Sequence, residues 1–155
     1  MTIYLDIQEP YQELVRPARL EEAAQSALDA ALATGDITIL ITDDETVADL
    51  NRRYLGKEGP TDVLSFPMRD PHAPDDFPLP PDEPPYLGDI LIALPYTQRQ
   101  AQREGRALED ELALLVVHGV LHLLGYDHAT PEEKARMWAR QNAILAELGL
   151  PPLAV

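Results

Sequence analysis

The sequence predicts an α+β fold: a single domain over residues 1–155, in which a small, mixed, four-stranded sheet packs with about five helices. Three observations lead to this prediction. Four apolar segments have the alternating or β-branched pattern of strands, and about five others place apolar residues at helical spacing. The strands and helices are partly segregated along the chain. A length of 155 residues suits one domain with one core, and no internal repeat is evident.

The first half of the chain alternates predicted strands with predicted helices. Residues 2–8 alternate apolar and polar side chains, as a half-buried strand does. Pro17 begins a helical pattern with an apolar face of leucines and alanines, and Gly35 is expected to end it. Residues 37–41 form a β-branched run typical of a strand buried on both faces. Thr42 stands three residues before a glutamate, which is the capping-box spacing, and is expected to begin a short amphipathic helix.

The second half is expected to supply strands at residues 62–66 and 87–94 and helices at residues 95–104, 107–124 and 131–148. Seven prolines between residues 68 and 86 exclude regular structure there and predict an extended surface loop. Thr130 is followed by a proline and by a glutamate at the capping-box position, so it is expected to begin the last helix, which Gly149 ends.

Composition and charge limit the classes of function. Twelve Lys and Arg against 27 Asp and Glu give a net charge of −15, which argues against a broad basic surface for nucleic acid. Positive charge is grouped in two local clusters: Arg52, Arg53 and Lys57, and Arg99, Arg103 and Arg106. Each cluster is either a local RNA contact or a solvated surface. With no cysteine, no signal-peptide pattern and no apolar run long enough for a membrane span, we expect a cytoplasmic protein with no membrane partner.

Three of the four histidines lie in one eleven-residue segment, HGVLHLLGYDH. His118 and His122 are four residues apart in an apolar helical pattern, so their imidazoles are expected on one face. Gly125 suits the left-handed conformation that ends a helix, and His128 follows closely enough to add a third nitrogen. Three neutral imidazoles with a fourth position for water make a zinc site of the catalytic type. We therefore expect one Zn²⁺ per chain.

The histidine spacing matches the metal motif of metzincin proteases, so the helix that carries it is expected to be a zincin-like central helix. Those proteases have a glutamate directly after the first histidine as the general base, whereas this chain has Gly119, which transfers no proton. Asp89 and Asp127 are two candidates for the missing base, or for a carboxylate that orients a metal-bound histidine. A turn-forming role explains each of them as well.

Three segments together, HGVLHLLGYDH, PTDVLSFP at residues 60–67 and LGDI at residues 87–90, resemble the YbeY family of bacterial endoribonucleases, which are rRNA maturation factors. The resemblance implies an α+β fold in which a long helix and a small sheet flank a zinc cleft, with the three histidines as ligands. It also implies a single-strand-specific, metal-dependent endoribonuclease. Single-stranded rRNA and ribosomal particles would be its partners, in maturation of the 16S rRNA 3′ end and in ribosome quality control.

The chain departs from the family at one position. Members often read Y-R-G-K-D before PTDVLSFP, with a functionally important arginine, where this chain has Leu55. Arg52, Arg53 or Lys57 would then supply the charge for phosphate binding, a lysine as a point charge only. Two alternatives remain open. One is a ribosome-assembly factor with a structural zinc, whose acidic surface attracts basic ribosomal proteins. The other is a zinc-dependent peptidase, which Gly119 disfavours.

Overall fold

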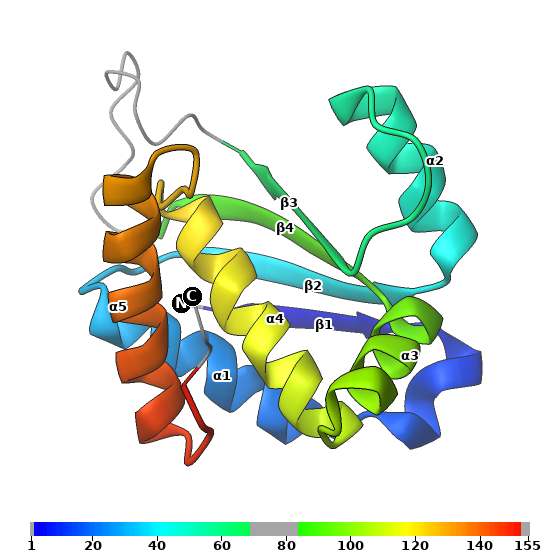
Figure 1. The fold of residues 1–155 in the computed structure, drawn as a ribbon, viewed down its shortest axis with the longest axis horizontal. Helices are drawn as coiled ribbons and strands as arrows, with labels where there is room; N and C mark the ends of the chain where they lie inside the picture. The colour runs from blue at the N-terminus through cyan, green and yellow to red at the C-terminus, as the bar shows by residue number, and fades with distance from the viewer. Residues whose placement is uncertain (1, 69–83, 153–155) are drawn as a thin grey trace.

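The computed structural model describes residues 2–68 and 84–152 (Figure 1). Within them the strands are β1 (Ile3–Ile7), β2 (Asp36–Thr42), β3 (Val63–Pro67) and β4 (Tyr86–Ala93). The helices are the 3-10 helix η1 (Glu9–Leu14), α1 (Pro17–Ala30), α2 (Asp44–Leu55), α3 (Leu94–Glu104), α4 (Leu108–Leu123) and α5 (Pro131–Glu147). The predicted α+β class and four-stranded sheet are confirmed. The short helix η1 had not been predicted, and most of the proline-rich loop, residues 69–83, lies outside the described residues.

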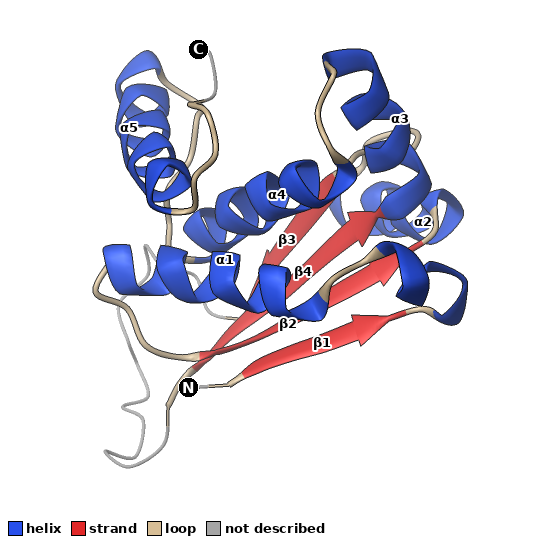
Figure 2. Ribbon diagram, turned by 90° about the horizontal axis from the view of Figure 1, so that it is seen from below, coloured by secondary structure: helices blue, strands red, loops and turns tan. Residues whose placement is uncertain are grey.

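The sheet is mixed and has the strand order β1-β2-β4-β3. Strands β1, β2 and β4 are parallel, and the edge strand β3 runs antiparallel to β4. One face carries the main core, in which isoleucines of β2 and β4 pack against α1 and α4. Figure 2 shows α1 and α4 lying over this same face. The other face has a smaller apolar cluster that includes Val47 of α2, Leu64 and Leu91. Helices α2 and α4 therefore lie on opposite sides of the sheet.

The end of α1 differs from the prediction. The helix ends at Ala30, and Leu32 takes a left-handed conformation (φ 54°) with an exposed side chain. The turn is held by a hydrogen bond from the Ala33 N–H to the Leu28 carbonyl, of 2.9 Å. Gly35, which was expected to end the helix, instead lies at the entry to β2. A Cβ there would lie only 2.5 Å from the Leu87 side chain, so close approach of the backbone requires the glycine.

The start of α2 also corrects the prediction. Thr42 is the last residue of β2, and Asp43 is the N-cap. Its Oδ1 accepts a hydrogen bond of 2.6 Å from the Thr46 N–H. Hydrogen bonds from the backbone of Thr46 lower the pKa of the Asp43 carboxyl below its ordinary value. The strand continues one residue further than the sequence indicated, because β2 remains paired with β4 through Thr42.

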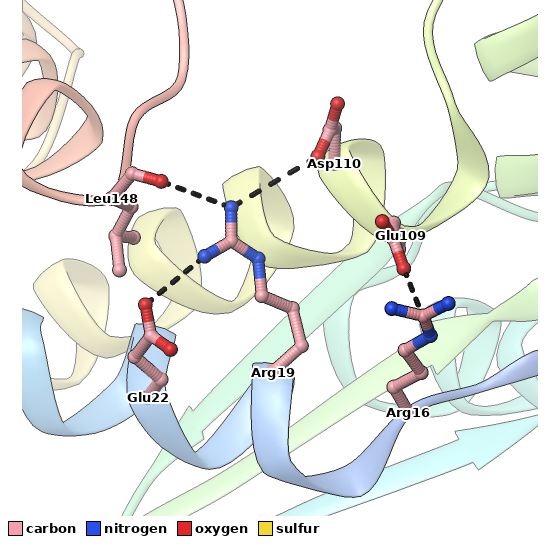
Figure 3. Close-up of polar contacts among 6 residues, drawn as sticks. All are labelled: Arg16, Arg19, Glu22, Glu109, Asp110 and Leu148. Carbon is pink, nitrogen blue, oxygen red and sulfur yellow. Dashed lines mark hydrogen bonds and ion pairs between the residues drawn. The ribbon is translucent and has the colours of Figure 1, made fainter.

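Arg19 connects the start of α1 to two other helices (Figure 3). Its Nη2 donates to the Leu148 carbonyl just after α5, at 3.1 Å, and lies 4.0 Å from the Asp110 carboxylate in α4. Its Nη1 pairs with Glu22 at 3.0 Å. The neighbouring pair of Arg16 with Glu109 is mostly exposed and is expected to add little stability. Arg19 thus helps to hold α5 beside α1 and α4, which matters because α5 borders the histidines.

No helix among the described residues is long and apolar enough to cross a membrane.

Candidate metal centre

The structure brings the three predicted histidines together. One ring nitrogen from each of His118, His122 and His128 can be chosen so that all three lie within 4.8 Å of one another. The Nε2 atoms of His118 and His122 are 3.0 Å apart. Helix α4 holds these two rings one turn apart. The chain then reverses at Gly125 (φ 101°), where the Tyr126 N–H donates to the Leu121 carbonyl at 3.0 Å, and this turn brings His128 back.

The surroundings favour neutral imidazoles. Burial lowers the pKa of His118 below its ordinary value. Burial and the adjacent His118 ring lower the pKa of His122 to about 4, against an opposing effect of the Asp127 carboxylate. The two adjacent Nε2 atoms cannot both carry a hydrogen at 3.0 Å. Neutral rings with converging lone pairs are the donor set that zinc and other imidazole-binding divalent metals take, so the residues present fit a metal ion.

Helix α5 forms one wall of the site, and sequence reasoning missed its contribution. Gln141 is completely buried, and its Oε1 lies 2.9 Å from Nδ1 of His118. Trp138, one turn earlier, packs edge-to-face on the rings of His118 and His128, with centroids 5.9 Å apart in each case. The sequence contained one sign of this role: Gln141 is a polar residue among the apolar residues that α5 buries.

Gly119 faces the sheet and not the histidines. A Cβ at this position would lie 3.0 Å from Cγ2 of Ile90, on β4. The carbonyl of Gly119 accepts a hydrogen bond of 3.3 Å from the Ser65 hydroxyl of β3. The close approach of α4 to the sheet leaves no space for the glutamate that metzincins have here. The prediction that this position supplies no general base agrees with the geometry.

The two candidate carboxylates lie in different places. Asp89 is on β4 and lies on the face of Leu91, away from α4, because side chains alternate along the strand. There its carboxylate accepts a hydrogen bond from the Tyr86 hydroxyl. Asp89 was predicted either at the metal or in a turn, and this position does not bring it to the histidines. The Asp127 carboxylate accepts a hydrogen bond of 2.7 Å from the backbone N–H of His128. Through this bond Asp127 helps to form the turn, which is one of the two roles predicted for it. Its charge also opposes the lowering of the His122 pKa.

A cavity of about 230 Å³ adjoins His118 on the side of α3. Asp62, just before β3, lines it, and the Asp62 carboxylate partly opposes the lowering of the His118 pKa that burial causes. Gln100 donates to Asp62 at 3.1 Å and to Glu111 at 2.9 Å. Glu111 is 1% exposed, and burial raises the pKa of its carboxyl. Asp62 lies within PTDVLSFP, a segment in which no catalytic residue was predicted.

The cations proposed for phosphate binding are not at the histidines. Arg52 and Arg53 project from α2, and both pair with Asp49 of the same helix, at 2.8 and 3.2 Å. Lys57 follows α2 and is exposed, and Leu55 is 49% exposed. In Figure 1, α2 and α4 lie on opposite sides of β3 and β4. A phosphate bound by these residues would therefore lie on the opposite side of the sheet from α4 and its histidines.

Comparison with known proteins gives concordant matches. A family model described as "Endoribonuclease YbeY" matches residues 5–149. The chain is 48% identical over 153 residues to Endoribonuclease YbeY of Roseiflexus castenholzii, covering 96% of this chain and 94% of that protein. It is 44% identical over 147 residues to Endoribonuclease YbeY of Symbiobacterium thermophilum, covering 94% and 92%. The solution structure of TM1509 from Thermotoga maritima has a similar fold, with a TM-score of 0.59 and 22% identity over 96% of this chain and 92% of that one.

Proposed function

The chain belongs to the YbeY endoribonuclease family, and from that premise we propose that it is a zinc-dependent endoribonuclease that cleaves single-stranded rRNA. It would act on ribosomal particles, in maturation of the 16S rRNA 3′ end and in ribosome quality control, with residues 1–155 as one catalytic domain. His118, His122 and His128 are the proposed metal ligands, the first two on a helix of the zincin type and the third after its glycine turn. The observation that carries the proposal is the convergence of three imidazole nitrogens within 4.8 Å, two of them on desolvated rings.

A bound zinc ion would lower the pKa of a water molecule and offset negative charge on the phosphodiester. The residues of the chain then have separate tasks. Burial keeps His118 and His122 neutral, so their nitrogens remain available as ligands. Asp62 shares a cavity with His118, and we propose its carboxylate as the proton acceptor, in place of Asp89. Asp127 shapes the turn that presents His128.

The charge distribution favours a single-stranded RNA substrate over a duplex. A net charge of −15 repels a duplex, whose phosphates are fixed in A-form geometry over a wide surface. A single strand can bend around the edge of the sheet and place one phosphate at the histidines and another at α2. Arg52, Arg53 and Lys57 are exposed there, and phosphate binding by the two arginines would compete with their pairing to Asp49.

The test compares the unaltered protein with His118→Ala and His122→Ala, with the exposed Gln102→Ala as the control for expression and folding. Zinc is measured by elemental analysis, and cleavage is followed on single-stranded and duplex RNA before and after chelation. We expect about one zinc per chain, loss of zinc and cleavage in both histidine variants, and faster cleavage of the single strand. Circular dichroism checks that each variant is folded.

Other outcomes separate the alternatives. Cleavage that persists after complete removal of metal would contradict the proposed mechanism. Zinc binding without cleavage would favour an assembly factor with a structural zinc, for which the acidic surface suggests basic ribosomal proteins as partners. Cleavage of casein instead of RNA would indicate a peptidase, against the position of Gly119 beside the sheet.

A further inference from the structure

We propose that Gln141 is a positioning residue that holds His118 in its metal-binding tautomer, so that the site is prepared before an ion arrives. The inference rests on the proposed function in one respect, which is that the histidines hold a metal. It concerns a side chain 23 residues away in the sequence, on a different helix from the one that carries His118.

The tautomer follows from which atoms face each other. Nδ1 of His118 lies 2.9 Å from Oε1 of Gln141, and an amide oxygen can only accept a hydrogen bond. Nδ1 therefore carries the hydrogen of the neutral ring, and Nε2 carries the lone pair. Nε2 is the atom that faces His122, at 3.0 Å. Gln141 thus directs the lone pair of His118 toward the other histidines. Carbonyl and carboxylate groups do the same for metal-bound histidines generally.

The opposite orientation of the Gln141 amide would defeat this arrangement. Its NH₂ group would then donate to Nδ1, the hydrogen of His118 would move to Nε2, and that nitrogen could bind no metal. In the observed orientation the Nε2 atom of Gln141 is buried and has no hydrogen-bond partner among the described residues. A buried donor without a partner is unfavourable, and we attribute this cost to the acceptor that Nδ1 of His118 needs. A glutamate at position 141 would keep an oxygen that accepts from Nδ1 of His118 and would remove the unpaired NH₂ group.

Trp138 complements Gln141 from the same helix. Its ring is nearly perpendicular to those of His118 and His128, at 88° and 87°. Trp138 thus limits rotation of the two rings, while Gln141 fixes the position of the hydrogen on one of them. Two residues of α5 therefore restrain the His118 ring, and one of them also contacts His128.

The experiment uses Gln141→Met, which removes the acceptor, and Gln141→Glu, which retains it. Gln102→Met is the matched control at an exposed helical glutamine. The zinc dissociation constant is measured by competition with a chromophoric chelator. The His118 tautomer is read in the metal-free protein from ring ¹⁵N shifts above pH 7. We expect hydrogen on Nδ1 of His118 in the unaltered protein, and zinc binding about 10–100-fold weaker in Gln141→Met. Gln141→Glu should bind at least as tightly as the unaltered protein, and Gln102→Met should match it.

Two results would overturn the inference: a metal-free protein with the hydrogen on Nε2 of His118, or a folded Gln141→Met that binds zinc as tightly as the unaltered protein. The tautomer is measured on the unaltered protein, so it decides the question even where Gln141→Met fails to fold. Neither readout requires cleavage of RNA. A protein that binds zinc through the predicted tautomer but cuts no RNA would refute the proposed function and leave this inference in place.

Discussion

Replacement of Gly119 by alanine tests the close contact between α4 and the sheet. The new Cβ would lie 3.0, 3.1 and 3.2 Å from three carbons of Ile90, which is fully buried on a strand paired on both sides. Overpacking of a core costs about 1–3 kcal/mol. Alanine gains about 1 kcal/mol over glycine within a helix. The balance is a loss of about 0–2 kcal/mol, and because Ile90 has little freedom to move we expect about 1 kcal/mol.

The assay is urea unfolding of the metal-free protein at 25 °C, extended to a double-mutant cycle with Ile90→Ala. That second change removes all three carbons near the new methyl group. Alone it is expected to cost about 2–5 kcal/mol, because it leaves a cavity. In the Gly119→Ala background it should cost about 2 kcal/mol less, because the clash, which is the net loss of about 1 kcal/mol plus the helix gain of about 1 kcal/mol, disappears with it. A Gly119→Ala protein more stable than the original, or two strictly additive changes, would refute the reasoning.

Three further predictions concern titration, helix capping and the second face of the sheet. His122 has a pKa of about 4 in the folded protein and about 6.5 in the unfolded state, so the unfolded state binds more protons between these values. The free energy of unfolding of the metal-free protein should therefore fall by up to about 3 kcal/mol as the pH falls from 6.5 to 4. Urea unfolding across this range measures the loss, which His122→Ala should reduce. Asp43→Ala should cost about 1 kcal/mol at pH 7 by removing the cap to Thr46. The difference should shrink as the pH falls below about 4, because the unfolded carboxyl is protonated there while the lowered pKa keeps the folded one charged to a lower pH. Asp89→Asn should leave zinc content and RNA cleavage unchanged, because this carboxylate lies on the face away from α4; a loss of either would place Asp89 at the site after all.

Local patterns were sufficient for much of the fold. The apolar spacing of α4 and the β-branched run of β2 predicted both elements to within a residue or two, because helix and strand repeats come from backbone geometry. The same geometry placed His118 and His122 on one face, and the glycine turn brought His128 to them. All of these relations span eleven residues or fewer, so neighbouring residues alone determine them.

Local patterns failed where the outcome depended on a distant segment. The role of Gly35 depends on Leu87, a contact with another strand that no nearby residue indicates. Alternation along β4 placed Asp89 on the face of Leu91, but only the packing of α4 showed that the histidines lie on the other face. The cavity lined by Asp62 likewise combines residues of α3, α4 and α5 with the segment before β3.

The sequence by itself determined most of the secondary structure and the trio of histidines, since both depend on periodic geometry within short segments. The tertiary structure alone decided which side chains surround that trio, Gln141 among them, and which carboxylate can reach it. The reason is that faces of elements far apart in the chain are matched by close packing of their side chains, and no periodicity within one segment encodes its partner.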